Sequence, residues 1–183
     1  MTQQNLLSFI NKVRKDIVAL GADLAPVEGV IFRRRVSPIG LCLYGDKKKI
    51  GCILEFSKKL LELDEEAIHE TVAHELLHTI KGSIGHDKKF MKYAKMLNEK
   101  YGLDIGEYMS PHIVQEGIKH HLYNYVVTCD DCGESIGYVR KAIVVKELLE
   151  TGEAPDYCCP FCGRRHLSID LVSSRLNKNE MTK

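Results

Sequence analysis

The first twenty residues place apolar and charged side chains at helical spacing. Apolar residues recur every three or four positions, with charged ones between them, at Leu6, Leu7, Ile10, Val13, Ile17, Val18 and Leu20. This period predicts an amphipathic helix over residues 4–20 that ends at Gly21. The segment lacks a basic start followed by an apolar core, so we expect no signal peptide.

Three short runs rich in β-branched residues come next and predict strands rather than helices. They are GVIFRRR, IGLCLYG and KIGCILEF, within residues 29–56. The second and third runs are joined by GDKKK at 45–49, which is typical of a hairpin turn.

Helical periodicity returns after the strands. We expect one helix over residues 65–80, capped by Asp64 and stopped by Gly82, and another over 87–100 that ends at Gly102. Residues 103–125 fit no single element, because Pro111 and Gly117 interrupt the pattern.

The character of the chain changes at Val126. Two turns with paired cysteines, each flanked by strand-like runs, enclose a helical segment at about 141–150. We therefore predict an α+β protein with a larger domain over 1–125, a ribbon-like domain over 126–172 and a polar tail over 173–183.

Composition narrows the class of protein. The chain has 183 residues, 44% of them hydrophobic, but no run of 18 or more apolar residues, so we expect no membrane span. Its net charge is +1, and residues 126–183 carry eight basic and nine acidic side chains, so charge alone does not indicate a nucleic-acid binder. Seven cysteines without an export signal predict a reducing, cytoplasmic setting.

The sequence HELLH in the predicted 65–80 helix suggests a metal site. His74 and His78 are four residues apart and so leave the same helix face, which suits one zinc ion with Glu75 beside it as a general base. A catalytic zinc usually has three protein ligands, and His86 is our third candidate because Gly82 and Gly85 let the chain turn back. The alternative for His86 is a surface histidine in a turn. His69 would point away from the metal.

Four cysteines form a second candidate site. Cys129 and Cys132 make one CxxC pair and Cys159 and Cys162 another, each followed by glycine, and this pattern is typical of a structural zinc. The 26 residues between the pairs exceed the usual spacing, and the helical segment would account for them. Cys158 would give CxxxC and is the competing ligand.

The combination resembles the SprT-like metalloproteases, which include bacterial SprT proteins and the eukaryotic Spartan protease. The residues that carry the resemblance are Gly40, Cys42 and Tyr44, then HELLH with His86 and Phe90, then TCDDCG and CCPFCG. It spans about residues 5–170. It implies a gluzincin-like fold and an endopeptidase in which a catalytic zinc on His74, His78 and His86 works with Glu75, beside a structural zinc on the four cysteines.

Two features depart from the family, which often has glycine where this chain has Asp87 and a shorter ribbon. Asp87 would either orient His86 or cap the next helix. Eukaryotic members digest proteins crosslinked to DNA, so DNA is a candidate partner beside the protein substrates, with Arg164 and Arg165 as its contacts. The competing readings are a non-proteolytic zinc module that binds DNA or protein, and a zinc hydrolase of another amide.

Overall fold

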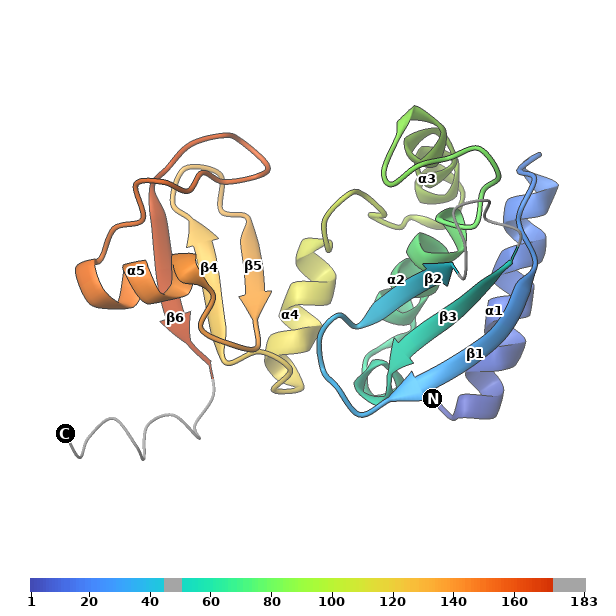
Figure 1. Ribbon diagram of the computed structural model, residues 1–183, viewed down its shortest axis with the longest axis horizontal. Helices are drawn as coiled ribbons and strands as arrows, with labels where there is room; N and C mark the ends of the chain where they lie inside the picture. The colour runs from blue at the N-terminus through green and yellow to red at the C-terminus, as the bar shows by residue number, and fades with distance from the viewer. Residues whose placement is uncertain (45–50, 173–183) are drawn as a thin grey trace. The chain divides into compact units, whose positions relative to one another are not determined.

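The computed structural model describes residues 1–44 and 51–172. Contacts divide the chain into two compact units, Met1–Ser110 and Pro111–Lys183. Each unit contains helices and one three-stranded sheet (Figure 1), which confirms the predicted α+β class. Among the described residues, no helix has the length and apolarity needed to cross a membrane.

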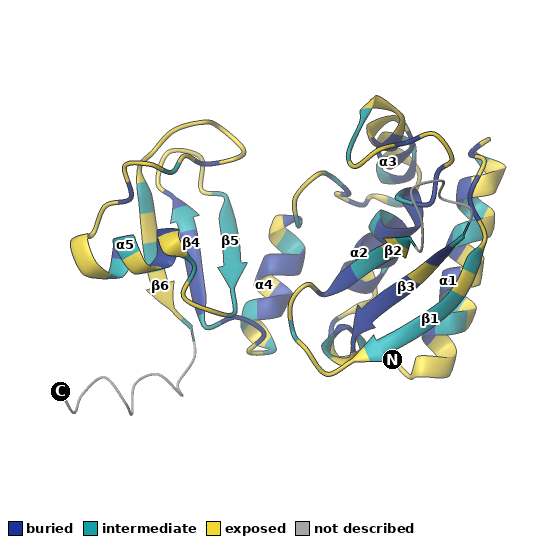
Figure 2. Cartoon of the chain, viewed as in Figure 1, coloured by how far each residue is buried: buried dark blue, intermediate teal, exposed yellow. Residues whose placement is uncertain are grey.

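The sheet of the first unit is mixed. Its strands are β1 (Val27–Arg33), β2 (Gly40–Tyr44) and β3 (Cys52–Ser57), in the order β1-β3-β2. β3 runs parallel to β1 and antiparallel to β2, and as the central strand it is the most buried of the three (Figure 2). The predicted pairing of the second and third strands is therefore confirmed, while the predicted turn at 45–49 lies outside the described residues.

Three α-helices and a short 3-10 helix complete this unit. They are α1 (Gln3–Ala19), the 3-10 helix η1 (Lys58–Glu62), α2 (Glu65–Leu77) and α3 (Lys88–Tyr101). The apolar face of α1 is buried as its periodicity predicted, at Leu6, Ile10, Val13 and Ile17. Side chains of Thr2, Asp64 and Asp87 cap the three α-helices by accepting hydrogen bonds from backbone N–H groups. α2 packs against α1, β2 and α3, and nine of its 13 residues are buried.

The helix expected over 65–80 is shorter in the structure, because α2 ends at Leu77 with His78 as its C-terminal cap. After α2, Ile80 pairs with Leu24 in an isolated antiparallel bridge. There the carbonyl of Thr79 accepts a hydrogen bond from Ala25 N–H at 2.8 Å. Because the Thr79 carbonyl accepts from Ala25, it is not available to continue the helix. The periodicity of the sequence could not indicate this contact.

The second unit is built on an antiparallel sheet with the order β5-β4-β6. Its elements are α4 (Pro111–Lys119), β4 (Tyr125–Cys129), β5 (Ser135–Tyr138), α5 (Ile143–Thr151) and β6 (Leu167–Leu171). Helix α5, which the sequence predicted at about 141–150, packs on β6 and contributes to a small core at Val144, Val145 and Leu148.

Helix α4 was not predicted, since Pro111 and Gly117 were interpreted as breaks. Pro111 is the first residue of the helix, where the missing N–H costs no hydrogen bond. Gly117 lies against Tyr123, and a Cβ there would be 2.2 Å from Cε2 of that ring. The glycine is thus a packing requirement. Because α4 contacts β5, the contact boundary falls after Ser110, whereas the change in composition begins at Val126.

Candidate metal centres

The structure brings together the three histidines of the first motif. Nε2 of His74 lies 3.1 Å from Nε2 of His78 and 3.2 Å from Nε2 of His86. Donors bound to one tetrahedral zinc at about 2.0–2.1 Å would be about 3.3 Å apart. The three imidazoles therefore have the donor chemistry and nearly the spacing of a three-histidine zinc site.

A tight turn places His86 against the other two rings. Gly82 and Gly85 have positive φ angles of 74° and 59°, which favour glycine. Asp87 accepts hydrogen bonds from the N–H groups of Lys89 and Phe90, both at 2.9 Å, and from Ile84 N–H at 2.8 Å. Of its two expected roles, Asp87 thus performs the capping role, and these bonds lower the pKa of its carboxyl.

Phe90 supports all three imidazoles from α3. Its ring centroid lies 5.1 Å from that of His74, 5.0 Å from His78 and 4.8 Å from His86, and the side chain is fully buried. Because the Phe90 ring packs against all three imidazoles, it limits the orientations that they can adopt.

His74 is held neutral by its surroundings. Burial, together with the neighbouring His78 and His86, lowers its pKa to about 3, although a hydrogen bond to the carbonyl of Gly106 opposes the shift. Its Nε2 faces the other two histidines. A neutral ring with its proton on Nδ1 presents an Nε2 lone pair to a metal ion.

Glu75 is buried between α2 and β2, with 7% of its surface exposed. Burial raises its pKa to about 8, while a hydrogen bond from the backbone N–H of Cys42 lowers it. Gly40 approaches so closely that a Cβ there would be 2.8 Å from both Cγ and Oε1 of Glu75. A nearby divalent cation would favour the charged carboxylate, so Glu75 is suited to take up and release a proton.

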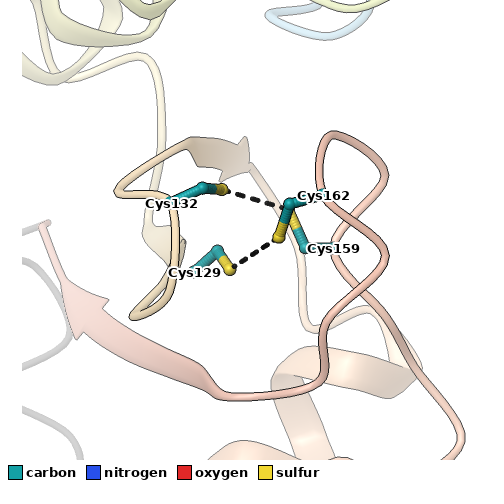
Figure 3. A group of neighbouring side chains, drawn as sticks. All are labelled: Cys129, Cys132, Cys159 and Cys162. Atoms are coloured by element: carbon teal, nitrogen blue, oxygen red, sulfur yellow. Dashed lines mark hydrogen bonds between the residues drawn. The ribbon is translucent and has the colours of Figure 1, made fainter.

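Four cysteines converge in the second unit (Figure 3). Sγ of Cys129 lies 3.6 Å from Sγ of Cys162, and Sγ of Cys132 lies 3.6 Å from Sγ of Cys159. Sulfurs on one tetrahedral zinc would be about 3.8 Å apart at a Zn–S distance of about 2.3 Å. Cys158 is exposed and lies outside this group.

The two cysteine turns have matching backbone geometry. Gly133 N–H donates to Cys129 O and Gly163 N–H donates to Cys159 O, both at 2.8 Å, and both glycines have positive φ angles. Desolvation raises the pKa of Cys129, but backbone N–H groups of Cys132 and Asp131 outweigh it and lower the pKa to about 7. Such N–H groups stabilise thiolates, the form that binds zinc.

Residues 21–112 match the sequence model of the SprT-like family, and this match covers half of the chain. The chain belongs to the SprT-like family. A search of curated proteins finds no match. The matched range of this SprT-like protein contains the mixed sheet and the three histidines, and it ends before the group of four cysteines.

Other polar side chains that the sequence singled out lie in structural contacts. His69 packs between Phe9 and Tyr101, with ring centroids 5.1 Å from each. The hydroxyls of Tyr44 and Tyr93 donate hydrogen bonds to the carbonyls of His78 and Gly21, at 2.6 and 3.0 Å.

The basic side chains proposed to contact DNA already have protein partners. Arg164 forms an ion pair with Asp131 at 3.2 Å, and Arg165 donates to the carbonyl of Pro155. In the first unit, Arg33 and Arg35 both pair with the buried Glu55. The ion pairs of Arg33, Arg35 and Arg164 offset part of the positive charge offered to a nucleic acid. The hydrogen bond of Arg165 to a neutral carbonyl leaves its charge unchanged.

Several residues at the histidine centre escaped the sequence analysis. Phe90 was noted only as a family match, and the buried Glu70 of α2 was not singled out. Glu70 precedes His74 by four residues and so shares its helix face, which was the available signal.

Proposed function

We propose that this SprT-like protein is a zinc-dependent endopeptidase. The observation that carries the proposal is the convergence of three imidazole Nε2 atoms, together with the buried Glu75 that follows His74 in α2. His74, His78 and His86 would hold the zinc ion, which when bound would supply Lewis-acid activation of water and of the scissile carbonyl. A gluzincin-like arrangement of the first unit belongs to the same proposal.

Residues of the chain itself would carry out the proton transfers of the reaction. Glu75 would accept the proton of the attacking water and later pass it to the amine that leaves. Burial of Glu75 keeps its pKa above the ordinary range, which brings its basicity closer to neutral pH.

The four cysteines would hold a second, structural zinc. Four thiolates fill a tetrahedral ion and leave no open position, so this site would stabilise the second unit without taking part in hydrolysis. Seven free cysteines fit a reducing compartment such as the cytoplasm.

We propose protein substrates near DNA, an assignment that comes from the family resemblance alone. The test is incubation of the full chain with a DNA-binding protein, with and without single-stranded DNA. A parallel sample is treated with a chelator and then resupplied with zinc. We expect cleavage that the chelator abolishes and zinc restores, and stimulation by DNA.

Each other result would change the proposal in a specific way. Cleavage without a DNA effect would keep the endopeptidase and remove the DNA association. No cleavage by a chain that retains two zinc ions would favour a binding module, and cleavage of small amides alone would favour another kind of hydrolase.

A further inference from the structure

Strand β2 contacts the stripe of α2 that carries Glu75 and His78. Thr71, Glu75 and His78 follow one another at spacings of four and three residues, so they lie on one side of the helix. A Cβ at Gly40, where β2 begins, would lie 2.8 Å from the Glu75 side chain and 3.0 Å from that of Thr71. Tyr44, at the other end of the strand, reaches the same stripe at His78.

The hydroxyl of Tyr44 donates a hydrogen bond to the backbone carbonyl of His78, and the two oxygens are 2.6 Å apart. This length is at the short end of the range for O–H···O hydrogen bonds. Helix α2 ends at Leu77 with His78 as its C-terminal cap, and the last carbonyls of a helix need partners from outside it. Tyr44 therefore supplies a partner from the sheet at the point where the helix ends.

Pairing within the sheet fixes the position of Tyr44. It lies opposite Cys52 in the antiparallel pairing of β2 with the central strand β3, and Cys52 is only 1% exposed. A side chain carried by a paired strand is held more precisely than one carried by a loop. The hydrogen bond from Tyr44 thus ties the backbone of His78 to the sheet of the first unit.

His78 differs from the other two histidines in how its backbone is held. His74 lies inside α2, and His86 lies in the turn that Asp87 closes. His78 stands where the chain leaves the helix, and its N–H bond to the His74 carbonyl is 3.3 Å long, against about 3.0 Å for a typical N–H···O bond. Helix ends fray more readily than helix interiors, so Tyr44 restrains the histidine at the weaker position of α2.

We propose that Tyr44 is a positioning residue for the histidine metal centre, because its hydroxyl fixes the His78 backbone and with it the direction of the His78 imidazole. Nε2 of His78 lies 3.1 Å from Nε2 of His74, and a change in the backbone at residue 78 would alter this separation. The inference rests on the proposed function in one respect, namely that the three histidines bind zinc.

The test measures zinc release from the full-length protein against a graded series of chelators. Tyr44→Phe removes the hydroxyl and keeps the ring, and circular dichroism checks that the fold is retained. We expect zinc binding at the histidine centre to weaken by about 10-fold, the lower end of the usual effect of losing a group that orients a metal ligand, because the hydroxyl acts through the backbone. The zinc on the cysteines should be released as in the wild type.

Tyr93→Phe is the matched control. The Tyr93 hydroxyl also donates a hydrogen bond to a backbone carbonyl of the first unit, that of Gly21, at 3.0 Å. Gly21 follows α1 and is not one of the metal-binding candidates. Both variants lose one hydrogen bond of the same kind, so both should lower the melting temperature by a similar amount. Only Tyr44→Phe should weaken zinc binding.

A second readout observes the two metal sites separately. In the cadmium-113 protein, a metal bound by nitrogen and a metal bound by four sulfurs resonate in different regions of the NMR spectrum. The nitrogen-site resonance should shift or broaden in Tyr44→Phe and stay unchanged in Tyr93→Phe. Replacement of Tyr44 by 4-aminophenylalanine returns an N–H donor to the same place and should restore the wild-type resonance.

The results separate this inference from the proposed function. If wild type binds two zinc ions and Tyr44→Phe releases them like Tyr93→Phe, with the cadmium resonances unchanged, the positioning role is wrong and the zinc site stands. If wild type and His78→Ala both bind a single zinc, the histidine centre binds none, and the proposed function fails together with this inference.

Discussion

Gly40 of β2 lies against the Glu75 side chain and leaves no room for a larger residue. In Gly40→Ala, the new Cβ would be 2.8 Å from Cγ and Oε1 of Glu75 and 3.0 Å from Cγ2 of Thr71. Either β2 or the carboxylate must move. We expect a loss of about 1–3 kcal/mol in the free energy of unfolding and a fall in kcat of about 10- to 100-fold with a smaller change in KM.

Gly29→Ala provides the matched control, because Gly29 lies in β1 and an added Cβ there meets nothing within 4 Å. Steady-state kinetics and urea unfolding of both variants check the prediction. If Gly40→Ala behaves like Gly29→Ala in both measurements, the close approach of Gly40 does not position Glu75.

His69 makes the free energy of unfolding of the first unit depend on pH. Burial lowers its pKa from the ordinary value of 6.5, and Nε2 has no hydrogen-bond partner within residues 1–44 and 51–172. The unfolded chain therefore takes up this proton more readily than the folded one. The contribution of neutral His69 is fully present above about pH 6.5 and is lost as the pH falls through the lowered, folded-state pKa.

The variant His69→Phe keeps a ring between Phe9 and Tyr101 and removes the titrating nitrogen. We expect it to be more stable by about 1 kcal/mol at neutral pH and to lose less stability than wild type between pH 7 and pH 5. Urea unfolding at several pH values measures both quantities. Parallel stability curves for the two proteins would contradict the assignment.

At the scale of elements, α4 is the helix that a single sequence did not predict. The caps at Asp64 and Gly102 and the buried stripe of α1 follow from local rules and were predicted, and the cap at Asp87 was one of two expected roles. By contrast, Gly117 is explained by the ring of Tyr123, which also fills the space over Gly137 of β5. A glycine that is required for packing between two elements looks, in one sequence, like a glycine that breaks a helix.

Substitution of Gly117 tests this account of α4. Alanine usually stabilises a helix interior relative to glycine by roughly 0.5–1 kcal/mol. In Gly117→Ala, the Cβ would instead lie 2.2 Å from the Tyr123 ring, so we expect a net loss of about 1–3 kcal/mol. Gln115→Ala, at an exposed position of the same helix, should change stability little. Thermal unfolding compares the two, and a stabilised Gly117→Ala would show that Tyr123 does not pack there.

The sequence predicted some parts of the candidate sites and not others. Helical spacing indicated that His74 and His78 lie on one face, and the CxxC pairs indicated the cysteine group, because local geometry controls both. The structure brings His86 to the same point, which the two glycines had suggested. The hydrogen bonds from Asp104 and Ser110 to Glu70 join residues 34 and 40 positions apart in sequence, so no local rule could indicate them.

At the scale of the whole molecule, the account requires two zinc ions with separate roles. Cys159→Ser removes one ligand of the cysteine group, so we expect loss of one zinc and destabilisation of the second unit by several kcal/mol, with the histidine-bound zinc retained. Cys158→Ser is the matched control, since Cys158 is adjacent, exposed and outside the group. Zinc content and thermal unfolding of the two variants give the comparison. Loss of both zinc ions from Cys159→Ser would contradict independent sites.

The most direct test of the central claim compares proteolysis by wild type and Glu75→Gln, with zinc content measured on the same samples. The amide occupies nearly the same volume as the carboxylate but cannot accept a proton from water. The control is Glu66→Gln, at an exposed position in the first turn of α2. We predict two zinc ions in all three proteins, unchanged cleavage by Glu66→Gln, and a loss of about 100-fold or more in Glu75→Gln. Cleavage by Glu75→Gln at the wild-type rate would contradict the mechanism.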